Sequence, residues 1–143
     1  MIIQQLSIFL ENRSGQLAQL TGLLAENGIN LRALNLAEAS EYGIARLIVS
    51  KPEKAAETLL QNEILSTLTP VVMVTVPDRP GGLSELLQLL GEKNINVSYM
   101  YSIFGSENGK ANMILRVEDP EKLETILQEN GYAAAGEDKL GMK

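Results

Sequence analysis

Two short polar segments, each with a glycine near its centre, have the residue types and spacing for ligand binding. Gly15 lies in residues 12–17 (NRSGQL), and Gly81 lies in residues 78–83 (DRPGGL). Glycine permits a sharp turn of the backbone and a close approach by another group. A helix that begins just after such a turn presents free N–H groups and a partial positive charge, which bind anions. The segments therefore predict two receptors for a carboxylate or a similar anion.

The first residue of each segment affects how an ammonium group would be bound. Asp78 offers a carboxylate at the position where the other segment has Asn12. A charge-assisted hydrogen bond is worth about 1.5–3 kcal/mol, against about 1 kcal/mol for a neutral one. We therefore expect an ammonium group on a bound ligand to be captured near Asp78.

The composition excludes most catalytic chemistry. The sequence has no histidine and no cysteine, so Ser-His pairs, Cys-His pairs, disulfides, and thiolate or imidazole metal sites cannot form. The general base that is usual near neutral pH is also missing. The acidic residues are scattered over predicted helix starts and the tail, which disfavours a carboxylate enzyme. We expect a protein that is not an enzyme, with no metal and no cofactor.

Charge and hydropathy limit the partners. The net charge of −6 would repel a phosphate backbone, which disfavours nucleic-acid binding. No apolar run reaches the roughly 18 residues that a membrane-spanning helix needs. The first residues, MIIQQ, lack the basic group of a signal peptide. We expect no nucleic acid, no membrane contact and a cytoplasmic location.

The two glycine segments belong to a longer duplication. Gly81 follows Gly15 by 66 positions, and the same offset relates Asn96 to Asn30. A repeat of this length indicates a duplicated small domain, and we predict domains over residues 1–69 and 70–143. Domains of that size are individually marginal because they bury only about 60% of their unfolded surface. We therefore expect the copies to pack on each other and on a second chain, as a homodimer.

Hydrophobic patterning predicts the same order of elements in both copies. Helices are expected after each glycine turn and after Pro52 and Pro120. The order strand-helix-strand-strand-helix-strand is the ferredoxin-like βαββαβ arrangement. We predict an α+β fold of two tandem domains, each an antiparallel sheet with its helices packed on one face. The predicted strands are residues 2–10, 31–38, 44–50 and 63–69, then 71–76, 96–104, 110–117 and 132–135.

Residues 78–83, followed by residues 94–97 (NINV), resemble the signature of the ACT domain. Residues 12–17 with residues 28–31 (GINL) are a slightly divergent second match, and together they cover the chain to about residue 135. The resemblance implies a stand-alone tandem ACT protein that binds an amino acid and has a regulatory role. It also implies effector sites where ACT domains pack together. There the loop before the first helix clasps the polar end, and a partner domain's first helix and adjacent strand complete the pocket.

The resemblance implies that the residues at matching positions in each copy contact the ligand. Ser14 departs from the proline that is more usual in the family and is present here as Pro80, so the two sites are expected to differ in affinity or occupancy. The implied contacts are Asn12, Ser14, Gly15, Gln16, Leu17 and Asn30 in the first copy, and Asp78, Pro80, Gly81, Gly82, Leu83 and Asn96 in the second.

Two tyrosines supply a further candidate wall. Tyr99 and Tyr101 share one face of the predicted strand over residues 96–104. They could border a pocket for an apolar or aromatic side chain, or they could pack within the sheet or at an interface. Both alternatives stay open at the level of sequence.

Two functions remain open. In the first, a free amino acid binds between domains and alters contact with a partner, such as an amino-acid metabolic enzyme or regulator. In the second, exposed sheet edges pair with other chains and no small molecule enters, since edge strands invite such pairing. The glycines would then serve only tight turns, and Arg13 and Arg79 would be solvated.

Overall fold

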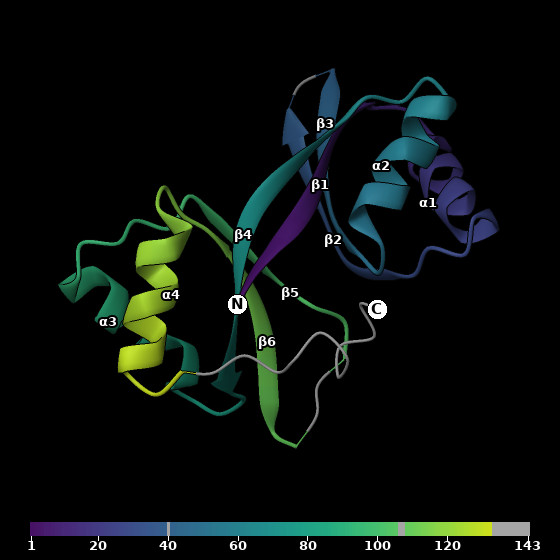
Figure 1. Cartoon of the computed structure of the whole chain (residues 1–143). Helices are drawn as coiled ribbons and strands as arrows, with labels where there is room; N and C mark the ends of the chain where they lie inside the picture. The colour runs from purple at the N-terminus through teal and green to yellow at the C-terminus, as the bar shows by residue number, and fades with distance from the viewer. Residues whose placement is uncertain (40, 106–107, 133–143) are drawn as a thin grey trace. The chain divides into compact units, whose positions relative to one another are not determined.

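A computed structural model describes the whole chain apart from residues 40, 106–107 and 133–143 (Figure 1). The chain forms two compact units. The N-terminal unit is Gln4–Thr69, and the C-terminal unit combines Met1–Ile3 with the described residues from Pro70 onward.

The α+β prediction is confirmed, because helices alternate with strands that pair antiparallel in the described residues. The strand order is β2-β3-β1-β4-β6-β5. Among these residues no helix has the length and apolar character needed to cross a membrane. The elements are β1 (Ile2–Glu11), α1 (Gln16–Glu26), β2 (Leu31–Ala39), β3 (Tyr42–Val49), α2 (Pro52–Gln61), β4 (Ser66–Pro77), α3 (Gly82–Glu92), β5 (Tyr99–Ser102), β6 (Lys110–Arg116) and α4 (Pro120–Glu129).

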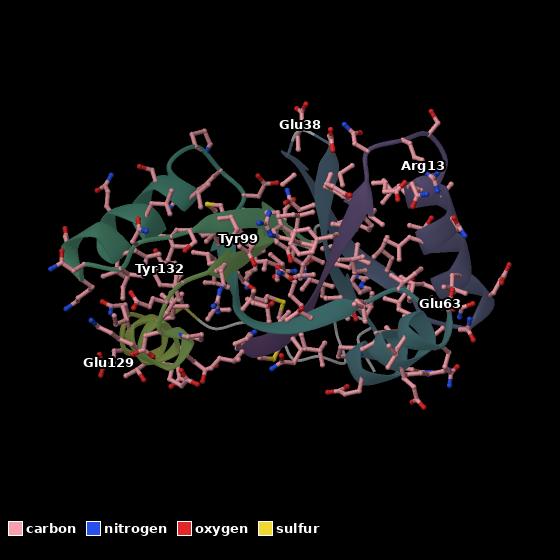
Figure 2. The ribbon with its side chains drawn as sticks, turned by 90° about the horizontal axis from the view of Figure 1, so that it is seen from above. Arg13, Glu38, Glu63, Tyr99, Glu129 and Tyr132 are labelled. Atoms are coloured by element: carbon pink, nitrogen blue, oxygen red, sulfur yellow. The ribbon has the colours of Figure 1, made fainter. Side chains whose placement is uncertain are left out.

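The two strands predicted over residues 63–69 and 71–76 are in fact one strand, β4. Proline disfavours helix at the residue before it, so Thr69-Pro70 continues an extended chain instead of ending it. The strand also begins later than predicted, because Glu63 adopts a left-handed conformation (φ 62) after α2 (Figure 2). The Ile64 N–H then donates to the Leu59 carbonyl at 2.8 Å, which keeps this segment folded against the helix end.

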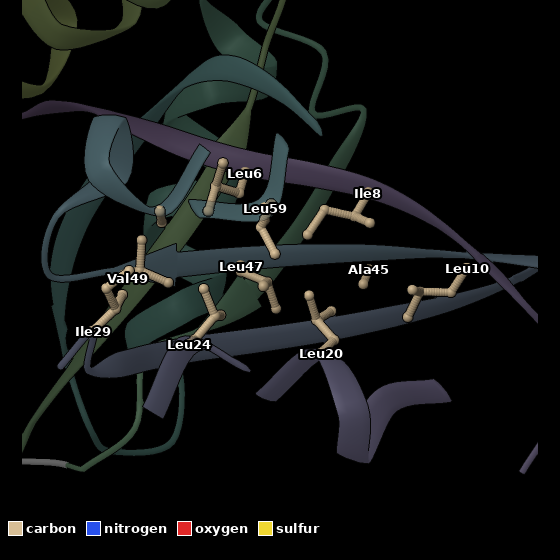
Figure 3. Close-up of a cluster of buried hydrophobic side chains, with 11 residues drawn as sticks. Leu6, Ile8, Leu10, Leu20, Leu24, Ile29, Ala45, Leu47, Val49 and Leu59 are labelled. Atoms are coloured by element: carbon tan, nitrogen blue, oxygen red, sulfur yellow. The ribbon is translucent and has the colours of Figure 1, made fainter. Parts of the chain in front are cut away.

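The core of the N-terminal unit lies between one face of the sheet and both helices. Alternate residues of β1, such as Leu6 and Ile8, are buried there, as the period of a strand requires. Leu20 and Leu24 of α1 and Leu59 of α2 converge on them (Figure 3). Both helices therefore cover the same face, as predicted for the first copy.

The core of the C-terminal unit follows the same plan. Val72 and Val74 of β4 pack with Leu86 and Leu90 of α3 and with Leu123 of α4. Residues 71–74 of β4 are buried without interruption, which is typical of a strand covered on both faces.

The helix boundaries of the C-terminal unit also match the sequence signals. The N-terminus of α4 is capped by the residue before it, because the Asp119 carboxylate accepts from the Lys122 N–H at 3.1 Å. Asn94 follows α3 in the left-handed conformation (φ 57), which asparagine adopts readily past the end of a helix. These two ends were therefore set by local residue types.

The described part of the second copy ends after α4 and does not complete the βαββαβ order. Most of the strand predicted over residues 132–135 lies outside the described residues, and Tyr132 itself donates its N–H to the Leu127 carbonyl at 2.9 Å. Met1 instead pairs with β4, because the Met73 N–H donates to the Met1 carbonyl at 2.8 Å. The Ile2 N–H donates to the Glu124 carboxylate at 2.9 Å. The strand predicted over residues 96–104 is also shorter, since β5 covers only Tyr99–Ser102.

Two glycines of α3, Gly82 and Gly91, differ in the space around them, and replacing each with alanine tests how tightly the start of the helix is packed. A Cβ at Gly82 would collide with the Pro77 carbonyl, whereas a Cβ at Gly91 would meet nothing within 4 Å. We predict that Gly82→Ala lowers the free energy of unfolding by about 1–3 kcal/mol through overpacking. Gly91→Ala should raise it by up to about 1 kcal/mol through helix propensity. Urea denaturation of both variants measures this, and equal effects would contradict the close approach at Gly82.

Candidate functional site

The N-terminal unit contains a hollow of about 280 Å³ beside the start of α1. It lies where the C-terminal end of β1 meets the connected ends of β2 and β3, on the face of the sheet that the helices cover. The wall consists of Leu10, Glu11, Asn12, Arg13, Gln16, Leu17, Leu36, Ala37, Glu38, Tyr42 and Gly43.

The pairing of β1, β3 and β2 places the strand residues of the hollow beside the loop that follows β1. Leu10 of β1 is paired with Gly43 of β3, which in turn is paired with Glu38 of β2. The loop after β1 is fixed to the same place, because the Asn12 N–H donates to the Glu41 carbonyl at 3.0 Å. Residues that are distant in sequence are thereby placed around one space.

Gly15 allows the loop to turn into α1. Its φ of 87° lies in the left-handed region, which glycine adopts without steric cost. No side chain caps the N-terminus of α1, so first-turn N–H groups and the positive end of the helix dipole face outward at this point. The predicted main-chain receptor for a carboxylate has this local geometry.

Arg13 is the cation of the hollow. Its Nε lies 3.3 Å from the Glu11 carboxylate. In the amide orientation that turns the Gln16 oxygen toward it, that oxygen accepts from Nη2 at 2.6 Å and from Nε at 2.7 Å. Both side chains of the Arg13–Glu11 pair are exposed, and exposed pairs of this kind contribute little to stability. The guanidinium can therefore exchange partners at small cost.

Glu38 supplies a second charge on another side of the hollow. Figure 2 shows it at the end of β2, while Arg13 lies beside the start of α1. The hollow thus combines charges of opposite sign at its rim with an apolar wall that includes Leu17 and Leu36. This combination suits a small molecule that is both zwitterionic and partly apolar.

Three of the predicted first-copy residues, Asn12, Gln16 and Leu17, line this hollow. Ser14 and Gly15 lie in the same loop but do not form its wall. Asn30 lies beyond the other end of α1, where its N–H donates to the Ser50 hydroxyl at 3.0 Å. An α-helix of 11 residues spans about 16 Å, so Asn30 cannot join Asn12 at one site within this unit.

Sequence reasoning missed the strand side of the hollow, which includes Leu36, Glu38 and Tyr42. Glu38 was placed only at the end of a predicted strand, and Tyr42 fell between two predicted strands, whereas Tyr42 begins β3. The signal that could have found Leu36 is the register of the predicted hairpin, which would have placed it near Leu17.

The corresponding turn of the second copy has similar backbone geometry and different side-chain contacts. Gly81 adopts φ 89° before α3, and no side chain caps that helix. Gly82 lies against the Pro77 carbonyl. Arg79 pairs with Glu85 of α3 at 3.2 Å and donates to the Pro80 carbonyl at 3.3 Å. Its guanidinium therefore lies along the first turn of the helix.

The remaining second-copy residues lie in three places. Asp78 donates its N–H to the Gly109 carbonyl at 2.8 Å, and Leu83 packs on the core. Asn96 lines a separate polar hollow of about 570 Å³, together with Ser98 and Asp119 but without the Gly81 turn. Within the described residues, no group of three or more acidic side chains could hold a metal ion.

Tyr99 and Tyr101 share one face of β5, as predicted. Their ring centroids are 6.5 Å apart and the rings lie at 16° to each other. Tyr101 is buried, whereas Tyr99 is only partly so. Their role as a pocket wall stays a prediction, since neither residue lines a hollow described above.

The chain matches the family model described as an ACT domain pair over residues 1–142. The chain therefore belongs to the ACT domain pair family, as the sequence resemblance suggested. No match to a curated protein was found.

Solved structures show the same fold. The crystal structure of protein BT0572 from Bacteroides thetaiotaomicron is 38% identical, with a TM-score of 0.90 over 99% of this chain and 96% of that one. The ligand-free regulatory subunit of aspartate kinase from Thermus thermophilus is 18% identical, with a TM-score of 0.66 over 90% and 96% of the two chains. The corresponding subunit from Thermus flavus is 16% identical, with a TM-score of 0.59 over 90% and 94%.

The turn before α1 provides a prediction about backbone strain. A Cβ at Gly15 would meet nothing within 4 Å, so any cost of substitution comes from its φ of 87°. Left-handed backbone costs most L-residues roughly 1–2 kcal/mol, with Asn among the most tolerant. We predict that Gly15→Asn lowers the free energy of unfolding less than Gly15→Val does, as measured by urea denaturation. An equal loss in both variants would show that side-chain crowding, and not backbone conformation, requires this glycine.

Proposed function

We propose that the chain is a non-catalytic regulatory module that binds a small effector of the amino-acid type through its ACT domains. The observation that carries the proposal is the hollow beside α1. Its wall contains Asn12, Gln16 and Leu17, which the family resemblance had implied as ligand contacts. Its volume of about 280 Å³ lies just below the usual range of about 300–1,000 Å³ for ligand pockets, which favours a small metabolite over a nucleotide.

A second copy of the chain would complete the pocket. β2 forms one wall of the hollow and is the last strand at its end of the sheet that the described residues form. An edge strand has unpaired backbone groups that favour pairing with another chain. In the homodimer that we propose, a partner ACT domain would close the hollow along this strand.

The regulatory role is supported by analogy. Two chains of similar fold are regulatory subunits of aspartate kinase, and this likeness in fold makes an amino-acid metabolic enzyme or regulator a reasonable partner. In this proposal, effector binding tightens the assembly and alters its contact with that partner.

A ligand-free interaction module is the second candidate, and one observation favours it. Phe9 and Leu65 are 76% and 77% exposed, and both line another open hollow of the N-terminal unit. Exposed apolar side chains that gather at one place are typical of protein contacts.

Thermal unfolding in the presence of each of the twenty amino acids distinguishes the two candidates. A ligand at about 100 times its Kd adds roughly 2.7 kcal/mol of stability, which corresponds to a rise of several degrees in Tm for a domain of this size. We expect such a rise with one amino acid or with a chemically related group of them. If no amino acid at millimolar concentration shifts Tm or the molecular mass in solution, the interaction module is the correct interpretation.

A further inference from the structure

We infer that the effector is an α-amino acid with an uncharged, apolar side chain, and that one molecule binds per chain, in the N-terminal hollow between Arg13 and Glu38. This inference rests on the proposed function and specifies its ligand class and stoichiometry.

The apolar wall of the hollow indicates that the ligand has an apolar side chain. Leu36 lies on the helix-covered face of the sheet, since it is paired with the core residue Ala45. Leu34, two positions earlier on that face, packs against the core, yet Leu36 remains 51% exposed where it lines the hollow. The hydrophobic effect favours covering such a residue, and an apolar ligand side chain between Leu36 and Leu17 would cover it.

The charges of Arg13 and Glu38 indicate that the polar end of the ligand has a carboxylate and an ammonium group. Arg13 uses Nε and Nη2 in its contacts with Glu11 and Gln16. Among the described residues, neither its Nη1 nor the Glu38 carboxylate forms a hydrogen bond or an ion pair. The guanidinium fits the ligand carboxylate, and Glu38 fits the ammonium.

The same charges disfavour a third charge on the ligand. Arg13 would serve the ligand carboxylate, Glu38 would serve its ammonium, and Glu11 is already beside Arg13. A charged ligand side chain would therefore face the leucine wall without a counter-charge, which is unfavourable. The hollow selects a neutral amino acid.

The second copy lacks this combination. At the offset of 66 residues, Leu36 corresponds to Ser102 and Glu38 corresponds to Phe104. Arg79 pairs with Glu85 on the helix that follows its loop, whereas Arg13 pairs with Glu11 on the strand that precedes its loop. Since β5 forms with Ser102 at the position of Leu36, and the chain beyond it continues with Phe104 at the position of Glu38, the second copy keeps its sheet without a leucine and a glutamate there. Their presence in the first copy is explained by binding, which gives one site per chain and not two.

Calorimetric titration of the full chain tests the ligand class. The panel is leucine, isoleucine, valine, methionine and phenylalanine, compared with serine, glutamate, aspartate, lysine and arginine. We expect one equivalent per chain of at least one apolar amino acid. Removing either charge from the tightest binder, as its α-amide or as its deaminated acid, should weaken binding at least tenfold.

Two variants with matched controls test the named residues. Leu36→Ser introduces the residue of the second copy, and Leu60→Ser changes a leucine that is 60% exposed on α2, outside the hollow. Glu38→Gln removes the charge proposed to hold the ammonium, and Glu41→Gln removes an exposed charge nearby whose side chain does not line the hollow. We expect losses of tenfold or more in affinity for Leu36→Ser and Glu38→Gln, and changes within twofold for the controls. Circular dichroism should show all four folded.

The outcomes separate this inference from the proposed function. Preference for a polar or charged amino acid, two equivalents per chain, or normal binding by Leu36→Ser and Glu38→Gln would overturn the inference while leaving an amino-acid sensor. Absence of binding by every amino acid would overturn both.

Discussion

The left-handed turn between β1 and α1 is the constraint on which the N-terminal site depends. The chain must change from strand to helix between Glu11 and Gln16, and Gly15 makes this possible at φ 87°. Two consequences follow from the tight turn. The first turn of α1 is left without a side-chain cap, and Arg13 is held next to Gln16. The turn thus creates the concave end of the unit, while the paired strands β2 and β3 supply the opposite wall.

Each unit depends on a strand that begins or ends in the other copy of the repeat. β4 starts in the N-terminal unit, where the hydroxyls of Thr69 and Ser7 lie 3.3 Å apart. It continues into the C-terminal unit, where Met73 pairs with Met1. A domain of about 66 residues buries only about 60% of its unfolded surface, and the C-terminal unit includes Met1–Ile3 from the other copy of the repeat. Duplication of the sequence therefore does not produce two independent folds.

The parts of the fold that were predictable from the sequence are those set by local residue types. The left-handed Asn94, the cap formed by Asp119 and the alternation of Leu6 and Ile8 each depend on a few neighbouring residues. The continuity of β4 was not predictable, because Pro70 is equally compatible with a domain junction and with an extended strand. The pairing of Met1 with β4 joins residues at opposite ends of the repeat, and no local pattern encodes it.

The candidate site likewise has one part that local sequence predicts and one part that it does not. The motif that the two copies share identifies only the first part. The motif residues that form the wall, such as Gln16 and Leu17, lie on the first turn of one helix and were found from sequence. Leu36 and Glu38 reach the same hollow only through the registers of β1 with β3 and of β3 with β2. Both copies keep the glycine turn, whereas the residues opposite it differ, with Ser102 and Phe104 in the second copy. The turn is therefore a feature that the two copies share, whereas the strand residues that face it differ between them.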